Sequence, residues 1–65
     1  MFIKTREVFK SKQTGAVIKV TKVIRSVAGN RFDDCLVRSY VNGKPVADSV
    51  RVVFADSIRR RYWKV

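Results

Sequence analysis

The sequence predicts a small, mainly β domain, and three features of the 65-residue chain support this fold class. Valine, isoleucine and threonine are spread along the whole chain, whereas leucine and glutamate are scarce, a balance that favours strands over helices. One segment alternates apolar and polar side chains and then loses its phase at Lys22, as a bent strand does. The pair Asn42-Gly43 between β-rich segments is the strongest short-range signal for a hairpin.

The first two strands are expected at residues 2–9 and 16–24, joined by a polar turn at 10–15 that contains a glycine. In the second strand Ile18 and Val20 share one face, but Lys22 then falls where an apolar side chain is due. A β-bulge or a strong bend restores the pattern. Bent strands of this kind suit a small barrel.

A third strand is expected from residue 31 or 32 to residue 41, where it enters a type I′ turn at Asn42-Gly43. The hairpin then pairs Val41 with Lys44, Tyr40 with Pro45, Ser39 with Val46, and Val37 with Asp48. Pro45 occupies a non-hydrogen-bonded position, where its missing N–H faces away from the third strand. This part of the fourth strand is therefore expected to be a sheet edge.

After a break at residues 47–49, a further strand is indicated by the alternating apolar residues Val50, Val52 and Phe54. Asp56 or Ser57 is expected to cap a short helical turn whose Ile58 and Tyr62 face the core. About five strands and a terminal turn predict a single domain over residues 1–65, an SH3-like barrel that hides most strand edges. An OB-like barrel is the alternative, and it ranks second because this fold normally needs a longer chain.

The charge of the chain indicates a polyanionic partner. Fifteen lysines and arginines stand against five acidic residues, which leaves a net charge of +10. Nucleic acid phosphates are the commonest partner of such a domain, followed by an anionic membrane surface or an acidic protein. Solubility alone would need a net charge of only about 2–8.

The residue types needed for catalysis or metal binding are largely missing. Histidine is absent, which removes the usual general base and most zinc ligand sets. Asp33 and Asp34 are neighbours on an expected strand and so point to opposite faces, with Asp34 placed to face Arg51 across the sheet. The lone Cys35 lies among apolar residues and is expected to be buried. We expect no enzymatic activity, no cofactor and no metal.

The third strand carries the first candidate binding residues. Leu36, Arg38 and Tyr40 share the face opposite Cys35 and Val37. An arginine beside an aromatic ring on an exposed strand suits base stacking with phosphate neutralisation. Alternatively, Tyr40 packs on Pro45 or covers the open side of the barrel. Four lysines frame the first turn and the strand that follows it, namely Lys10, Lys12, Lys19 and Lys22. Of these, Lys19 on the solvent side of the strand would extend the patch, and the alternative is a scattered, solvated charged face.

The C-terminal segment is the densest basic cluster and holds Arg59, Arg60, Arg61, Trp63 and Lys64 as further candidates. Three consecutive arginines on a helix spread over about 200° of arc, so at most two face one row of phosphates. Arg60 and Lys64, four residues apart, are expected on one exposed helical face. Tyr62 and Trp63 either pack on the core or stack on a base.

The chain resembles small SH3-like proteins encoded by bacteriophages and prophages. The resemblance rests on a turn glycine before the valine-rich strand at 15–20, on the β-hairpin, and on the segment Phe-x₃-Ile-Arg-Arg-Arg-Tyr at 54–62. The resemblance implies a phage-type accessory protein in a bacterial cytoplasm. It also resembles the small basic chromatin proteins of thermophilic archaea in size and charge, although those are much richer in lysine and glutamate.

The leading expectation is binding of DNA or RNA, single- or double-stranded, with little sequence preference. The alternative is a protein-interaction module that binds and inhibits or redirects an acidic host protein. No membrane-spanning segment is expected, which places the protein in the cytoplasm. A monomer or a weak homodimer through the edge at Pro45-Val46 fits either reading.

Overall fold

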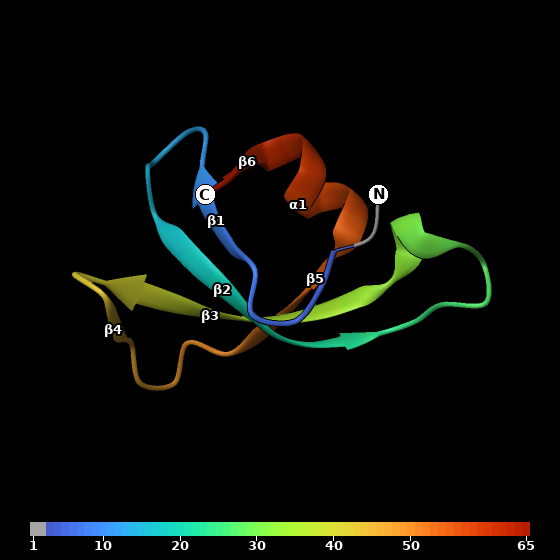
Figure 1. Ribbon diagram of the computed structural model, residues 1–65, viewed down its shortest axis with the longest axis horizontal. Coiled ribbons are helices and arrows are strands. Elements are labelled where there is room, and N and C mark those ends of the chain that lie inside the picture. Colours follow the sequence, from blue (N-terminus) through green and yellow to red (C-terminus); the bar gives the residue numbers. More distant parts are fainter. Residues whose placement is uncertain (1–2) are drawn as a thin grey trace.

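The computed structural model describes residues 3–65, which form one bent antiparallel sheet of six strands and one short α-helix (Figure 1). The elements in chain order are β1 (Val8–Ser11), β2 (Val17–Ile24), the 3₁₀ helix η1 (Asn30–Phe32), β3 (Asp34–Val41), β4 (Lys44–Pro45), β5 (Arg51–Phe54), α1 (Ala55–Arg61) and β6 (Tyr62–Lys64). The predicted mainly β fold with a short C-terminal helix is confirmed.

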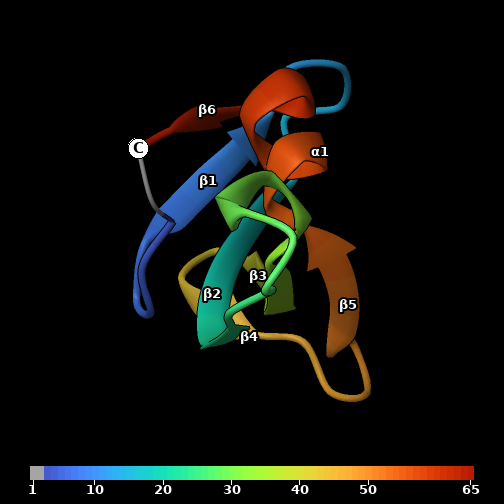
Figure 2. The same cartoon turned by 90° about the vertical axis from the view of Figure 1, so that its right-hand side faces the viewer.

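The sheet curves into a small, open barrel-like fold that α1 completes. The strands follow the order β4-β3-β2-β1-β6, and β5 pairs with β3 on the edge that β4 also uses. Within the described chain no ladder joins β5 to β6, and α1 lies between these two strands (Figure 2). Ala55 and Ile58 on α1 are fully buried, so the helix fills the gap with apolar side chains rather than with backbone hydrogen bonds.

The predicted bulge in β2 is confirmed and lies at Thr21. Val20 pairs with Val37, but the next pair joins Lys22 to Leu36, so Thr21 is the extra residue. Its hydroxyl donates to the carbonyl oxygen of Leu36 at 3.1 Å. A bulge increases the local twist and bends the strand, which lets β2 take part in the curvature of the barrel.

The hairpin between β3 and β4 is confirmed near its turn. Asn42 and Gly43 have φ angles of 53° and 77°, the left-handed values that a type I′ turn needs. Tyr40 pairs with Pro45, as predicted. The N–H of Val46 donates to the carbonyl of Ser39 at 2.9 Å, so this expected pair also forms.

Beyond this point the expected hairpin register is wrong. Residues 46–50 form a loop with Asp48 at a φ of 56°, and β3 pairs next with β5. Val37 therefore lies opposite Arg51 and not opposite Asp48. The expected contact between Asp34 and Arg51 is also absent, because in this register Asp34 pairs with Phe54.

The predicted starts of two strands also need correction. The first strand begins at Val8, because a turn with a positive φ at Arg6 separates it from the buried Ile3; Phe2 lies outside the described residues. The third strand begins at Asp34, because η1 occupies residues 30–32.

Neither Asp56 nor Ser57 caps α1, which starts directly after β5 with no side-chain cap. The N–H of Ala55 instead donates to the carbonyl oxygen of Asp33 at 3.0 Å.

A buried carboxylate joins the loop after β2 to the rest of the fold. Asp33 is only 1% exposed, and its two oxygens accept from the N–H of Ser26 and from Nη1 of Arg25, both at 2.8 Å. The Ser26 N–H, followed by the Arg25 guanidinium, holds the pKa of Asp33 below its ordinary value.

Candidate nucleic-acid interface

One face of the sheet forms the core and the other faces solvent, and β3 shows the division. Cys35 and Val37 are fully buried, as predicted for Cys35, and burial raises the pKa of its thiol. Leu36, Arg38 and Tyr40 alternate with them and lie on the outer face. Residues paired across an antiparallel ladder have their side chains on the same face. The registers therefore identify the outer-face neighbours of Arg38 and Tyr40.

The outer face carries a row of aromatic and cationic side chains across four strands. Trp63 on β6 pairs with Lys10 on β1, Lys10 pairs with Val17 on β2, and Val17 pairs with Tyr40 on β3. Pro45 ends the row on β4.

The next row along the strands consists of Val8, Lys19 and Arg38. We call the outer-face residues Trp63, Lys10, Val17, Tyr40, Lys19 and Arg38 the basic-aromatic row.

Each aromatic ring of this row has a lysine ammonium beside it. Nζ of Lys19 lies 5.7 Å from the centroid of the Tyr40 ring, and Nζ of Lys12 lies 4.4 Å from that of Trp63. Both distances fall within the range of cation–π contacts. Trp63 is nevertheless 61% exposed, so a planar group can reach its ring. The row thus offers ring faces with positive charge next to them.

A small depression adjoins Tyr40. It has a volume of about 240 Å³ and is lined by Val8, Val17, Lys19, Tyr40, Asn42 and Gly43. Pockets that hold a whole drug-sized ligand are larger, at about 300–1,000 Å³. The depression is therefore of a size for a fragment such as a single base, with aliphatic side chains and a tyrosine as its walls.

The structure brings four of the predicted site residues together and separates the other four from them. Lys19, Arg38, Tyr40 and Trp63 lie on the outer face. Arg59, Arg60 and Arg61 belong to α1, which packs on the opposite face of the sheet.

Three of the four separated residues lie close to acidic side chains. Arg59 is half-buried near Asp33, whose pKa it helps to lower. Nε of Arg60 lies 3.3 Å from Oδ2 of Asp56. Nζ of Lys64 lies 2.6 Å from Oε2 of Glu7, and this hydrogen bond lowers the pKa of Glu7.

The expected exposed helical face shared by Arg60 and Lys64 does not exist. The helix ends at Arg61, and Lys64 belongs to β6, where it lies opposite Phe9. Tyr62, at the start of β6, packs against the core, whereas Trp63 points outward. Helical spacing alone does not indicate where α1 ends, because Tyr62 turns extended directly after Arg61 with no glycine or proline at this point.

An exposed apolar surface lies further along the same outer face, and sequence reasoning missed it. Two rows build it: Lys22, Leu36 and Val52 are in register, and so are Ile24, Asp34 and Phe54. Phe32 of η1 meets Phe54 edge-to-face, with ring centroids 6.5 Å apart. We call Ile24, Phe32, Leu36, Val52 and Phe54 the apolar patch. Ile24, Phe32, Val52 and Phe54 are each at least 46% exposed.

Comparison of the chain with protein families, with curated proteins and with solved structures finds no match. Within residues 3–65, no three acidic, histidine or cysteine side chains gather as ligands for a metal ion. No helix in the same range has the length and apolar character required to cross a membrane.

Proposed function

We propose that this protein binds a single strand of DNA or RNA through the basic-aromatic row, with little sequence preference and without catalysis. The observation that carries the proposal is the register of the row, which aligns Trp63, Lys10 and Tyr40 on one exposed face. Bases stack on aromatic rings whatever their identity, and lysines neutralise the phosphates between them.

The spacing of the two rings supports a single strand. Tyr40 and Trp63 are three strand positions apart, which corresponds to roughly 14 Å at about 4.8 Å per strand. Two separate bases of one strand can therefore stack on the two rings, with Lys10 and Lys19 between them. A duplex keeps its bases stacked inside and would leave both rings without a partner.

The proposal is tested by fluorescence anisotropy with short single- and double-stranded DNA and RNA. Tyr40→Ala should weaken single-strand binding by about 1–3 kcal/mol, the usual contribution of one stacked base. The matched control is Phe54→Ala, which removes an exposed aromatic ring from the apolar patch and should leave binding unchanged. Absence of binding to any nucleic acid at about 50 mM salt would overturn the proposal, since low salt favours phosphate contacts.

A protein partner is the second candidate function, and the apolar patch favours it. Exposed apolar surface with charged neighbours is typical of protein-interaction sites. Arg31 places its guanidinium 5.3 Å from the Phe32 ring centroid, and Lys22 lies beside Leu36. Basic side chains around the patch fit an acidic protein. The resemblance to phage-encoded proteins supports a bacterial host protein in the cytoplasm.

Affinity capture from nuclease-treated bacterial lysate with paired variants tests this second function. An acidic protein retained by wild type and by Tyr40→Ala, but lost with Phe54→Ala, would support it. Retention by both variants would contradict a role for the apolar patch.

A further inference from the structure

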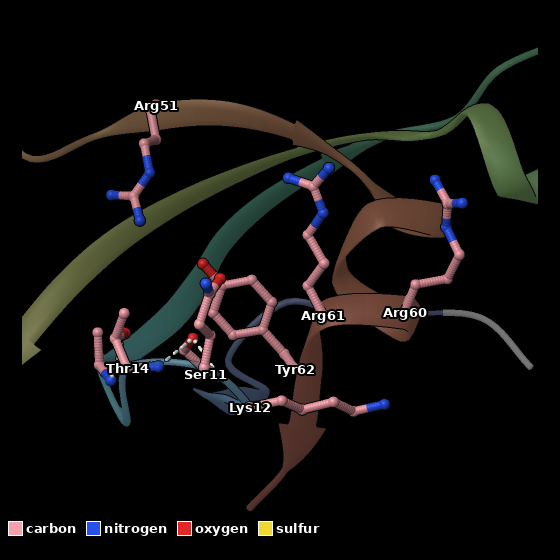
Figure 3. Close-up of a pocket in the computed structure, with 9 residues that line it drawn as sticks. Ser11, Lys12, Thr14, Arg51, Arg60, Arg61 and Tyr62 are labelled. Atoms are coloured by element: carbon pink, nitrogen blue, oxygen red, sulfur yellow. Dashed lines mark hydrogen bonds between the residues drawn. The ribbon is translucent and has the colours of Figure 1, made fainter.

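The open end of the barrel beside the turn between β1 and β2 forms a second pocket, which we call the barrel mouth (Figure 3). Its volume is about 470 Å³, within the usual range for small-molecule sites of about 300–1,000 Å³. It is lined by residues 11–14 and Ala16 of the turn, by Arg51 of β5, and by residues 60–62, where α1 ends and β6 begins. Four of the lining residues are lysine or arginine and none is acidic.

The turn that frames the barrel mouth is held by hydrogen bonds. The Ser11 hydroxyl oxygen accepts from the N–H groups of Gln13 and Thr14, each at 3.2 Å. The N–H of Lys12 donates to the carbonyl oxygen of Arg61 at 2.9 Å, which ties the turn to the end of α1. The walls of the pocket are therefore fixed relative to each other.

Arg51 is held in place at this pocket by two serines. It pairs with Val37 and so lies on the inner face of the sheet, where its Nη1 donates to Ser39 Oγ at 3.0 Å and to the carbonyl oxygen of Ser49 at 3.1 Å. Both bonds use the same nitrogen. The N–H groups on Nη2 and Nε have no partner among residues 3–65 and remain for a ligand.

Arg61 and Tyr62 complete the barrel mouth. The Arg61 guanidinium has no ion-pair or hydrogen-bond partner in the described part of the chain. Figure 3 shows Arg51 and Arg61 reaching the pocket from two sides, with the Tyr62 ring between them.

The other two cations of the barrel mouth are engaged elsewhere. Arg60 pairs with Asp56, Lys12 lies over Trp63, and both extend away from the pocket centre in Figure 3.

We infer that the barrel mouth binds a phosphate monoester between Arg51 and Arg61. The planar guanidinium presents its N–H groups in a fork that matches phosphate oxygens. Two guanidinium groups balance a monoester, which carries a charge of about −1.5 to −2 at pH 7, better than they balance a singly charged carboxylate. The Tyr62 ring adds a flat wall for the group that bears the phosphate. This site is separate from the basic-aromatic row and does not rest on the proposed function.

NMR titration of the ¹⁵N-labelled protein with inorganic phosphate and with adenosine monophosphate tests this inference, with adenosine as the control. We expect saturable shifts at Arg51, Arg61 and Tyr62 with both phosphates and none with adenosine. Arg61→Gln should weaken binding about tenfold, as loss of a charge-assisted hydrogen bond does. Arg51→Lys keeps the charge but removes the fork, and should weaken binding to a similar extent.

Arg60→Gln is the matched control, because it removes the same charge from the neighbouring position of α1. It should change phosphate affinity less than twofold, since its guanidinium pairs with Asp56. An effect equal to that of Arg61→Gln, or shifts spread evenly over all the basic residues, would overturn the site. So would the absence of saturable binding by wild type.

Oligonucleotides with and without a 5′-phosphate identify the source of the group. Tighter binding of the phosphorylated strand that disappears in Arg61→Gln assigns the barrel mouth to a strand end. Binding of adenosine monophosphate with no preference between the two strands assigns it to free nucleotides. Tyr40→Ala should leave either result intact, so failure of the nucleic-acid proposal is distinguishable from failure of this one.

Discussion

The outer face of the sheet divides into two regions of different chemistry, although β3 runs through both. Around Arg38 and Tyr40, the cross-strand neighbours on β2 are Lys19 and Val17, and the row continues through Lys10 to Trp63. Around Leu36, the neighbours are Lys22 on one side and Val52 on the other, with Ile24 and Phe54 one row further. The change occurs within two residues of β3, next to the bulge at Thr21. One surface is suited to phosphates and bases, and the other to apolar contacts.

The difference shows that a net charge of +10 does not describe the surface as a whole. Acidic residues partner some of the cations: Glu7 pairs with Lys64, Asp33 with Arg25, and Asp56 with Arg60. These pairs lie outside the basic-aromatic row, which keeps Lys10, Lys19 and Arg38. The C-terminal cluster is the densest run of charge in the sequence, yet the charge available to a strand of nucleic acid gathers on the sheet.

The largest expected effect is on the core that both regions share. Ile58→Ala removes a fully buried side chain of α1, which should lower the free energy of unfolding by about 2–5 kcal/mol. Denaturant unfolding is followed by Trp63 fluorescence, which reports the basic-aromatic row, and by labelling of Cys35 beneath the apolar patch. The two transitions should coincide in wild type and in the variant. Separate midpoints would mean that the two regions fold independently.

A smaller effect is expected at the turn beside Tyr40. Gly43 has a φ of 77°, so Gly43→Val places a β-branched residue in the left-handed region and should destabilise the fold by more than about 1 kcal/mol. Because Gly43 lines the depression next to Tyr40, the variant should also weaken binding of single strands. Lys44→Val, on the exposed neighbour, is the control for stability, measured by chemical denaturation. Equal midpoints for the two variants would contradict the strain argument.

Acid should destabilise the protein through two carboxylates, Asp33 and Glu7. The ordinary pKa values are 3.8 for Asp33 and 4.5 for Glu7, and both are lowered in the folded protein. As the pH falls, the unfolded chain takes up protons first, so the free energy of unfolding decreases below about pH 4.5 and continues to fall through the lowered values. Above that range both carboxyls are ionised in either state and their contribution is complete.

Melting temperatures measured against pH in the two single variants separate these contributions. Asp33→Asn should flatten the acid side of the profile more than Glu7→Gln, because Asp33 is 1% exposed and holds both Ser26 and Arg25. A profile unchanged by Asp33→Asn would show that Asp33 takes up its proton alike in the folded and unfolded states, and would contradict its lowered pKa.

The sequence predicts what depends on short-range chemistry. The turn at Asn42-Gly43, the bulge near Lys22 and the burial of Cys35 are all local in origin, and all three are confirmed. The register of β5 is different, because it depends on how the loop at 46–50 folds. That loop decides where Arg51 and Phe54 lie, so neither the barrel mouth nor the apolar patch could be predicted.

In the candidate site too, features set by local sequence were predicted and features set by long-range contacts were not. Alternation along β3 correctly placed Arg38 and Tyr40 on the outer face, and Lys19 faces them as expected. The helical spacing of Arg60 and Lys64 failed, since an extended Tyr62 ends α1 and β6 pairs with β1. Pairing of a C-terminal strand with an N-terminal one is a long-range contact that no local pattern reports.

The smallest expected effect tests whether binding depends on where charge lies or only on how much there is. If Lys10 and Lys19 each meet a phosphate of a single strand, the slope of log K against log salt should become shallower by about 1.4 in the double variant Lys10→Gln/Lys19→Gln, at about 0.7 per contact. The matched variant Lys22→Gln/Arg31→Gln removes the same charge beside the apolar patch. Its slope should stay at the wild-type value, because a strand that lies on the basic-aromatic row does not reach those side chains.

Both slopes are measured by anisotropy over the same salt series. Equal reductions in the two variants would show that binding follows net charge, and the outer face would then have no defined track for nucleic acid.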